Sequence, residues 1–303
     1  MNTPPITTAK TLGIDLGGTK IATAVVENGK ILARKQVATP TTGQDAVFDT
    51  MADVAKVLLA DYPDVPAVGI GSPGPIDFDK GEIIFAPNIH GMTNAPIVQG
   101  LKTRLALPVT LENDANAAGY AEHLYGAARD VESSIFITIS TGIGGGIFLG
   151  ERIWHGAHGL AGEVGHMTLQ AVGAVGGDGH FGGWEAIAAG RAIARDGSYV
   201  FNQEMSTRDI FAKAQDGDHH ANKIIERAAR YTGIGIANLV KAFDPHVFII
   251  GGGMSQAGDF YFDKVRSYLS EYLTGYPQPT LRIAELGVDA GVIGAAAVAL
   301  PHS

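Results

Sequence analysis

Two neighbouring residues in this sequence could bind and deprotonate a hydroxyl group. Asn113 and Asp114 lie in the stretch Glu112-Asn-Asp-Ala-Asn116, directly after the apolar run VTL. An amide can both donate to a hydroxyl and accept from it, and a carboxylate can take up its proton. Asp114 is therefore a candidate general base for group transfer to an alcohol. Asp is also common as the N-cap of a helix, so both interpretations are open at this point.

Further side chains that suit a polyhydroxyl ligand occur in glycine-rich segments. Glu163 and His166 lie in Gly162-Glu-Val-Gly-His166, and Glu185 ends the stretch GGDGHFGGWE. Glu and His supply several hydrogen-bonding atoms for a polyol, whereas a lone His is more often structural. Asn88, in APNIHGM, adds a loop amide whose role is open.

The segment Asp15-Leu-Gly-Gly-Thr-Lys20 is a candidate phosphate-binding turn. Backbone amides of a tight glycine turn can surround a phosphate oxygen, and a threonine hydroxyl adds a donor. A carboxylate at a strand end can face Mg²⁺ through water. An ordinary hairpin turn has the same appearance. A strand follows this turn, which excludes a dinucleotide fingerprint, and the spacing to the lysine excludes a Walker loop. The candidate residues are Asp15, Gly17, Gly18, Thr19 and Lys20.

Two later glycine clusters add to the same chemistry. Thr141-Gly-Ile-Gly-Gly-Gly146 repeats the strand–glycine–strand pattern in the second half of the chain. Two such turns in equivalent positions favour an anion held from both sides. Gly251-Gly-Gly-Met254 follows the apolar run VFII and could border a flat base, or could be a simple strand-to-helix turn. The candidate residues here are Thr141, Gly142, Gly144, Gly252 and Gly253.

The elements that must position these residues alternate between strands and helices. Apolar alternation and glycine turns predict strand hairpins over 12–37 and 133–154 and a short strand within 67–77. They also predict a strand, a turn and a helix over 109–128, and a strand that runs into glycines over 246–255. Helical spacing predicts helices over 45–60, 184–195, 219–243 and 259–273, and a small-residue helix at the C-terminal end. The hairpins form a weak internal repeat, so we predict an α/β protein of two domains.

Composition limits the possible partners and compartments. The chain has 303 residues, a formal net charge of −9 and no cysteine. An acidic chain without Lys/Arg clusters is a poor binder of nucleic acid. No apolar run is long enough to span a membrane, and the first ten residues lack the pattern of a secretory signal. We therefore expect a cytoplasmic protein that binds neither nucleic acid nor membrane.

Seven motifs together resemble the ROK family of sugar kinases and repressors. In chain order they are DLGGTK, GSPGP, ENDANAA, STGIGGG, GEVGH, WEAIAAG and GGGMS. The resemblance is strongest to bacterial ATP-dependent glucokinases. It implies an actin-like ATPase (ribonuclease-H-like) two-domain fold with the active site in the interdomain cleft. It also implies a small domain of residues 1–118 plus 290–303, a larger domain of residues 119–289, and a homodimer or homotetramer.

The resemblance also implies roles for individual residues. Asp114 would be the general base on the sugar 6-hydroxyl, and Asn113 would hold the 4-hydroxyl. Glu163, His166 and Glu185 would hold the 1-, 2- and 3-hydroxyls, with Asn88 and Gly74 completing the pocket. The turns at 17–19 and 141–144 would hold the phosphates of Mg²⁺-ATP, and Gly252 and Gly253 would border the adenosine. Glucose is the expected substrate, and fructose, mannose and N-acetylhexosamines are alternatives.

One segment departs from the family pattern. Many members carry C-x-C-G-x-x-G-C-x-E here, and its three cysteines bind structural zinc together with the histidine of the GEVGH-type motif. In this chain Gly176, Asp178 and Gly183 stand in the cysteine positions. Structural zinc needs about four nitrogen or sulfur ligands. We therefore expect no structural zinc and no metal site among these residues, and we expect Phe181 and Trp184 to hold the loop by packing. An improvised metal site from His166, Asp178 and His180 is the alternative.

Two other functions compete with the kinase. A sugar-responsive regulator of the same family needs an added basic helix-turn-helix, and only fourteen Pro/Thr-rich residues precede Asp15. A non-catalytic member or an actin-like assembly protein is the other alternative. Asp114 argues against the non-catalytic member, and turnover with any sugar would exclude both as the main role. Polyphosphate in place of ATP as the phosphoryl donor stays open.

Overall fold

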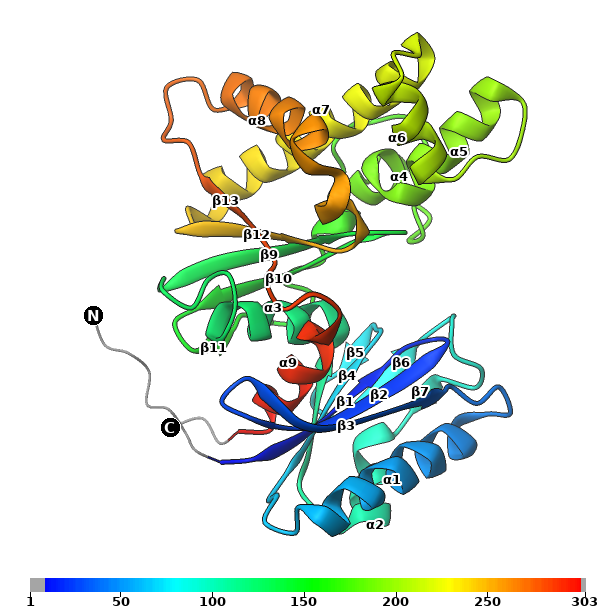
Figure 1. Ribbon diagram of the computed structural model, residues 1–303, viewed down its shortest axis with the longest axis vertical. Helices are drawn as coiled ribbons and strands as arrows, with labels where there is room; N and C mark the ends of the chain where they lie inside the picture. The colour runs from blue at the N-terminus through cyan, green and yellow to red at the C-terminus, as the bar shows by residue number, and fades with distance from the viewer. Residues whose placement is uncertain (1–8, 301–303) are drawn as a thin grey trace. The chain divides into compact units, whose positions relative to one another are not determined.

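The computed structural model describes residues 9–300 and divides into two compact units (Figure 1). The first unit comprises residues 1–130, 146–160 and 285–303, and the second comprises 131–145 and 161–284. The first unit thus extends beyond the predicted 1–118 plus 290–303. The outermost residues of that prediction, and most of the segment judged to lack a secretory signal, lie outside the described residues.

The first unit contains a five-stranded sheet with the order β3-β2-β1-β4-β8. Its strands are β1 (Thr11–Leu16), β2 (Lys20–Glu27), β3 (Lys30–Ala38), β4 (Val68–Ser72) and β8 (Val109–Asn113). Strands β1 to β3 pair antiparallel, as the predicted hairpins require, whereas β1, β4 and β8 run parallel. The carboxyl ends of these three parallel strands therefore lie at one edge of the sheet.

A second five-stranded sheet repeats this order as β11-β10-β9-β12-β13. Its strands are β9 (Ser133–Ile139), β10 (Ile143–Leu149), β11 (Arg152–Ile153), β12 (Val247–Gly251) and β13 (Thr280–Ile283). Strand β12 runs parallel to both β9 and β13. The repeat predicted from the glycine hairpins is thus a repeat of sheet topology.

The helices of the first unit cover its sheet. They are α1 (Gln44–Asp61), α2 (Ile97–Leu105), α3 (Asp114–Leu124), α9 (Ala290–Val298) and the short η3 (Gly287–Asp289). A small three-stranded sheet of β5 (Ile76–Asp77), β6 (Glu82–Phe85) and β7 (Thr93–Ala95) completes this unit. The apolar faces of α1 and α2 pack on the main sheet around a core that includes Ile14, Met51 and Ile70.

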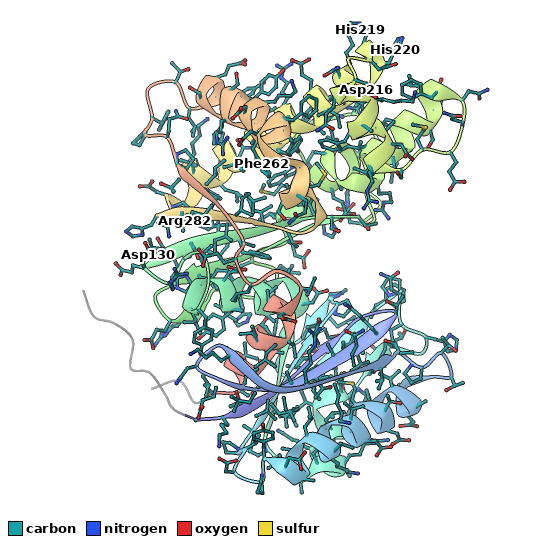
Figure 2. All side chains as sticks on the ribbon, viewed as in Figure 1. Asp130, Asp216, His219, His220, Phe262 and Arg282 are labelled. Carbon is teal, nitrogen blue, oxygen red and sulfur yellow. The ribbon has the colours of Figure 1, made fainter. Side chains whose placement is uncertain are left out.

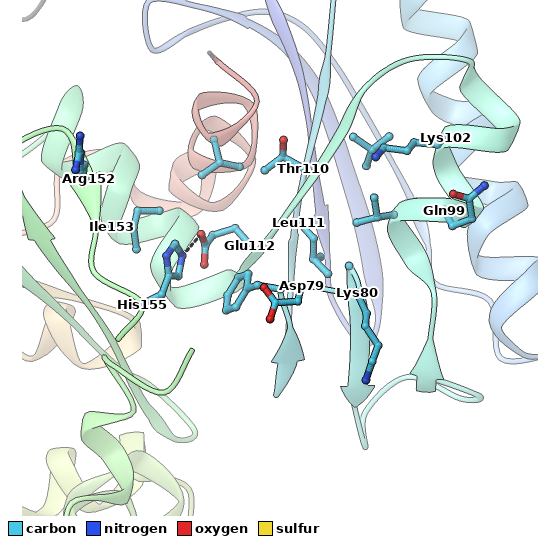
Figure 3. A pocket seen from close by; sticks show the side chains of 15 residues that line it. Asp79, Lys80, Gln99, Lys102, Thr110, Leu111, Glu112, Arg152, Ile153 and His155 are labelled. Carbon is cyan, nitrogen blue, oxygen red and sulfur yellow. Dashed lines mark hydrogen bonds and ion pairs between the residues drawn. The ribbon is translucent and has the colours of Figure 1, made fainter. Parts of the chain in front are cut away.

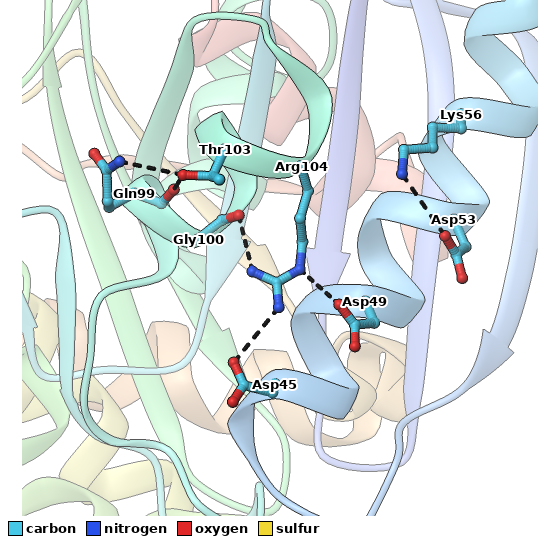
Figure 4. A network of polar contacts seen from close by, with 8 residues as sticks. All are labelled: Asp45, Asp49, Asp53, Lys56, Gln99, Gly100, Thr103 and Arg104. Atoms are coloured by element: carbon cyan, nitrogen blue, oxygen red, sulfur yellow. Dashed lines mark hydrogen bonds and ion pairs between the residues drawn. The ribbon is translucent and has the colours of Figure 1, made fainter.

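Arg104 on α2 links the two helices that cover this core (Figure 4). Its guanidinium donates to Asp49 Oδ1 at 2.7 Å and lies 3.5 Å from Asp45 Oδ1, both on α1. It also donates to the carbonyl of Gly100 in its own helix at 3.1 Å. These partners are exposed, so the pairs orient the two helices and contribute little to stability.

Helix α9 approaches the sheet and α3 unusually closely because small residues line the contact. A Cβ placed on Gly69 of β4 would lie 1.7 Å from the carbonyl oxygen of Ala295. A Cβ placed on Gly294 of α9 would lie 1.7 Å from the carbonyl oxygen of Ala117 on α3. Backbone therefore meets backbone at these points, and only glycine fits.

The second unit places its helices around β9, β12 and β13. They are α4 (Trp184–Ala188), α5 (Gly190–Phe201), α6 (Thr207–Gln215), α7 (His219–Phe243), α8 (Gly258–Tyr272) and the short η1 (Val164–His166) and η2 (Gly253–Ala257). Figure 2 shows His219 and His220 at the exposed start of α7, whereas Phe262 lies on the buried face of α8. The helix predicted over 184–195 is in fact two helices, because the chain is extended at Ala189.

No helix of the described part of the chain is both long enough and apolar enough to span a membrane.

Candidate functional site

The strand register of the first unit brings three of the predicted residues to one sheet edge. Asp15 of β1 pairs with Gly71 of β4, and Ser72 of β4 pairs with Asn113 of β8. Asp114 then begins α3 directly after β8. Residues that are about 100 positions apart in the sequence thus meet where parallel strands end, which is the common location of ligand sites in α/β sheets.

The turn from β8 into α3 leaves the Asp114 carboxylate available for chemistry. The N-cap is Asn113, whose Oδ1 accepts from the backbone amides of Ala115 and Asn116 at 2.9 and 3.2 Å. The N-cap interpretation of Asp114 is therefore wrong, although its Oδ1 also accepts from the amide of Ala115 at 2.8 Å. Water reaches Asp114, but the surrounding protein removes much of its hydration and raises the pKa of its carboxyl group. A raised pKa suits a general base that works near neutral pH.

Asp15 is the second acid at this edge. Burial, reinforced by the negative charge of Asp114, raises the pKa of Asp15 to about 6, and Lys20 and Arg34 oppose that rise. Because the carboxyl groups of Asp15 and Asp114 both have raised pKa values, a bound cation would stabilise their ionised forms. Oxygen ligands of this kind match the preference of Mg²⁺, which usually takes one or two carboxylates and otherwise substrate phosphates and water.

The first glycine turn is held from both sides by backbone contacts. The amide of Gly17 donates to the carbonyl of Lys20 at 2.9 Å, and the hydroxyl of Thr39 donates to the carbonyl of Gly17 at 2.7 Å. A Cβ on Gly18 would lie 2.8 Å from the carbonyl oxygen of Asn88. The turn is thus packed against the Asn88 loop, while Thr19 stays exposed to a ligand.

The remaining predicted residues of this unit lie beside these groups. A Cβ on Gly74 would lie 3.5 Å from Asn113 Nδ2, so the backbone of Gly74 borders the side chain that is predicted to hold a hydroxyl. Because Asn113 Oδ1 is committed to the helix, its Nδ2 is the group that can donate to that hydroxyl. The Lys20 side chain is exposed at the start of β2.

Glu112, which the sequence interpretation did not use, stabilises the Asn113–Asp114 turn through buried hydrogen bonds. The residue is only 3 % exposed. Oε1 accepts from the amide of Asn113 and from Asn116 Nδ2, each at 2.9 Å, and Oε2 lies 2.7 Å from His155 Nε2. The hydrogen bond to Glu112 raises the pKa of His155, although burial opposes that rise. The two residues line a cavity of about 700 Å³ next to Phe78, whose ring lies 4.6 Å from that of His155 (Figure 3).

In the second unit, the glycine turn after β9 is narrower than predicted. The amide of Ser140 donates to the carbonyl of Gly142 at 2.8 Å, so the turn comprises Ser140–Gly142. Gly144, predicted to be part of the turn, lies inside β10. Thr141 is exposed at the tip, where its hydroxyl can meet a ligand.

Glu185 lies against this turn. Its Oε2 accepts from the amide of Ile143 at 3.0 Å, and its Oε1 accepts from Arg191 at 2.9 Å. A Cβ on Gly142 would lie 2.2 Å from Oε2, so the carboxylate lies directly over the α-carbon of that glycine. The structure therefore joins a residue predicted to bind sugar to a turn predicted to bind phosphate.

Glu163 is the N-cap of the short helix η1, and His166 is the last residue of that helix. Glu163 Oε2 lies 3.6 Å from His166 Nδ1, and both side chains are about half exposed. Gly165 permits this bend, because a Cβ there would lie 2.0 Å from the carbonyl oxygen of Ile143. A Cβ on Gly183 would lie 3.9 Å from the His166 carbonyl oxygen, so the end of the loop that carries Glu185 packs beside His166.

The loop over residues 176–183 is held by backbone pairing. The amide of Gly176 donates to the carbonyl of His180 at 2.7 Å, and the amide of Gly182 donates to the carbonyl of Ala174 at 3.0 Å. Trp184 is fully buried, as expected, but Phe181 is 58 % exposed, so the prediction that Phe181 packs was wrong. The loop forms short bridges instead, and its aromatic ring is not needed to close it.

Asp178 and His180 pair within this loop, with 3.4 Å between Oδ2 and Nδ1. Within residues 9–300 no group of three or more His, Cys, Asp or Glu side chains is arranged to hold a metal ion.

A second cavity, of about 840 Å³, opens beside the same turn. Ser140 and Thr141 line one part of it, and Gly253 and Met254 line another. The parallel pairing of Gly251 with Thr138 brings these segments together. Gly252 has φ 77°, and a Cβ there would lie 2.5 Å from the carbonyl oxygen of Ile139, so the close approach requires glycine. This volume is in the usual range for a small-molecule site.

Comparison with known proteins identifies the family. The family model described as "ROK family" matches residues 11–301. The chain belongs to the ROK family. A hexokinase of this family from Thermus thermophilus has a TM-score of 0.92 and 45 % sequence identity, covering 96 % of this chain and 97 % of that one. A Streptomyces griseus glucokinase in complex with glucose and AMPPNP has a TM-score of 0.80 and 36 % identity, covering 96 % and 99 %.

Another relative is named for a different substrate. The N-acetylmannosamine kinase of Haemophilus influenzae is 36 % identical over 94 % of this chain and 93 % of its own length. Together with the two matching sheet orders, these similarities establish the actin-like ATPase fold that the motifs implied. Among the predicted site residues, Asp15, Gly17–Lys20, Gly74, Asn88, Asn113 and Asp114 lie in the first unit. Thr141, Gly142, Gly144, Glu163, His166, Glu185, Gly252 and Gly253 lie in the second.

Proposed function

We propose that this protein is an ATP-dependent hexose kinase that converts glucose and ATP to glucose 6-phosphate and ADP. The observation that carries the proposal is Asp114, a carboxylate of raised pKa that is water-accessible at a strand end beside Asn113. The similarity to a glucokinase that binds glucose and AMPPNP supports the choice of sugar and of nucleotide. We further propose that the protein acts in the cytoplasm as a homodimer or homotetramer.

In the proposed reaction Asp114 takes the proton of the 6-hydroxyl as that oxygen attacks the γ-phosphorus. The bond between the γ-phosphorus and the bridging oxygen breaks, and ADP leaves. Phosphoryl transfer needs accurate positioning more than covalent help from the protein. Asn113 Nδ2 would orient the sugar through its 4-hydroxyl, next to the backbone of Gly74 and with Asn88 completing the pocket. The resemblance assigns the remaining hydroxyls to Glu163, His166 and Glu185 of the second unit.

The nucleotide is assigned to the glycine turns and to the 840 Å³ cavity. In this proposal the amides of the Gly17–Thr19 and Thr141–Gly142 turns hold the phosphates, and Gly252 and Gly253 border the adenosine. Mg²⁺ would be held near Asp15, whose pKa of about 6 fits a group that is stabilised by a cation, and would supply charge neutralisation of the phosphates. Exclusion of water from the bound substrates would prevent hydrolysis of ATP.

Release of ADP measured across a panel of sugars tests the proposal. The panel contains glucose, mannose, fructose, glucosamine, N-acetylglucosamine and N-acetylmannosamine, each with Mg²⁺-ATP and separately with polyphosphate. We expect the highest kcat/KM with glucose and ATP. A higher value with N-acetylmannosamine would assign the chain to the activity named for its Haemophilus relative. Absence of turnover with every sugar would contradict the kinase proposal.

Asp114→Asn tests the assigned base. The amide keeps the size of the side chain but cannot accept the proton, so kcat should fall by about 10²–10⁴-fold. Glucose binding, measured by calorimetry, should persist because Asn113 and the hydroxyl ligands of the second unit are unchanged. A variant that keeps wild-type kcat would show that another group is the base.

A further inference from the structure

Glu185 is engaged in a way that the proposed reaction does not explain. As a sugar ligand its carboxylate should face hydroxyl groups, yet both of its oxygens have protein partners. Oε2 accepts from the backbone amide of Ile143 and Oε1 accepts from the guanidinium of Arg191. The Glu185 side chain is only 17 % exposed in this arrangement.

The two donors that hold Glu185 are of the kinds that bind phosphate. The amide of Ile143 directly follows Gly142 in the glycine turn, and backbone amides of such turns bind anions. Guanidinium groups bind carboxylate and phosphate with similar geometry. A carboxylate that uses both donors thus occupies an anion-binding position of this unit.

Arg191 belongs to the same surroundings as the proposed nucleotide. It lines the 840 Å³ cavity together with Thr141 and Gly253. Its backbone amide donates to the carbonyl of Thr141 at 3.2 Å, which fixes the start of α5 against the turn. Its side chain is 61 % exposed, so the guanidinium can change partner with little rearrangement of the core. Nothing in the sequence motifs assigned it a role.

We propose that Arg191 is a further nucleotide-binding residue and that Glu185 competes with the nucleotide phosphates for Arg191 and for the amide of Ile143. This inference rests on the proposed kinase function. When a sugar hydroxyl draws the Glu185 carboxylate away, both donors become available to ATP. Before that, the carboxylate repels the phosphates from the turn. Glu185 would thereby couple the two substrates, so that sugar increases the affinity for nucleotide.

The competing explanation is that Glu185 only stabilises the loop that carries it. In that case removing its charge weakens the turn, and nucleotide affinity falls or stays unchanged. Competition predicts that nucleotide affinity rises instead, because a neutral side chain at position 185 no longer repels phosphate.

Calorimetric titration with Mg²⁺-AMPPNP, with and without saturating glucose, separates these explanations. We expect glucose to raise the affinity of the wild-type protein for the nucleotide by about fivefold or more, which is the lower end of common coupling between sites. Glu185→Gln should bind AMPPNP more tightly than wild type when glucose is absent, and glucose should then add little. Arg191→Ala should bind AMPPNP more weakly than wild type when glucose is present.

Glu163→Gln is the matched control, because it removes an acid that is also assigned to the sugar but that lies beside His166 rather than against the turn. It should weaken glucose binding without raising AMPPNP affinity in the absence of sugar. The inference is overturned if Glu185→Gln does not bind AMPPNP more tightly than wild type. It is also overturned if neither wild type nor Glu185→Gln binds AMPPNP. Turnover of glucose by the wild-type protein tests the kinase proposal separately, so the two failures are distinguishable.

Discussion

The pairing of His155 with Glu112 should stabilise the fold by an amount that depends on pH. His155→Phe removes the hydrogen-bond donor but keeps an aromatic ring against Phe78, whose centroid lies 4.6 Å from that of His155. Glu112 is 3 % exposed and would then carry a charge with one oxygen unpaired. The variant therefore tests a polar contact with little change in packing.

The expected magnitude follows from the geometry. With Nε2 and Oε2 2.7 Å apart, the charge centres are about 4 Å apart, which corresponds to ~4 kcal/mol at an effective dielectric constant of 20. The His155 side chain is 36 % exposed, and solvent screening reduces the gain to about 2 kcal/mol. When His155 is neutral, the ion pair is lost, and the hydrogen bond from the neutral imidazole to the Glu112 carboxylate contributes about 1 kcal/mol in this partly exposed site.

The direction of the pH dependence is fixed by the raised pKa of His155. A histidine whose pKa is higher in the folded state stabilises the fold fully below its ordinary pKa of 6.5, and it loses that contribution as pH rises through its folded pKa. The advantage of wild type over His155→Phe should thus be largest near pH 6 and smallest near pH 9.

Urea unfolding of wild type, His155→Phe, Glu112→Gln and the double variant measures the coupling energy between the two side chains. We expect about 2 kcal/mol at pH 6 and about 1 kcal/mol or less at pH 9. A coupling energy near zero at pH 6, or one that grows with pH, would refute the reasoning.

Three further predictions concern other parts of the molecule. Asp15→Asn should raise the free energy of unfolding at pH 7 by up to ~3 kcal/mol, since a pKa raised from 3.8 to about 6 makes ionisation costly in the folded state; urea titrations should show the gain disappearing below about pH 4. Gly69→Ala should lower the free energy of unfolding by about 3 kcal/mol or more, because its Cβ would lie 1.7 Å from the Ala295 carbonyl oxygen. Gly177→Ala is the control: the closest contact of its Cβ is at 4.0 Å, so the urea midpoint should change little. Elemental analysis of the purified protein should find no stoichiometric zinc, because the three cysteine positions of the zinc loop hold other residues; one zinc per chain would contradict this.

The parts of the fold that local chemistry determines were predictable from the sequence. Glycine between two apolar runs forces a hairpin, so the strand pairs on either side of Gly17 and Gly142 followed from the pattern. The helix predicted over 219–243 begins at His219 because the Asp218 carboxylate accepts from the amides of His220 and Ala221, and it ends at Phe243, before Asp244 in the left-handed conformation. Asp15 and Asn113 lie near the carboxyl ends of β1 and β8, so they come to one edge of the sheet once β1, β4 and β8 are known to be parallel.

Contacts between distant residues were not predictable in this way. Glu112 and His155 are 43 positions apart, and no local pattern indicates that a charged residue after VTL is buried and paired. The partners of Glu185 depend on how α4 and α5 pack against the Ser140–Gly142 turn. The sequence predicted one helix over 184–195 in place of these two, so it could not indicate that packing. Phe181 was expected to pack because aromatic residues usually do, but backbone bridges already close its loop.

The close fit of α9 has a consequence for how the protein is made. The sheet of the first unit consists of residues before 114, but the helix that covers β1 and β4 and packs on α3 is formed by residues 290–298. The ribosome therefore releases the whole second unit before the segment that completes the first. During synthesis the glycine-lined surface of β4 is exposed to solvent, while residues 131–145 and 161–284 can already fold. The first unit to begin is the last to finish, and its final step is the docking of one short helix.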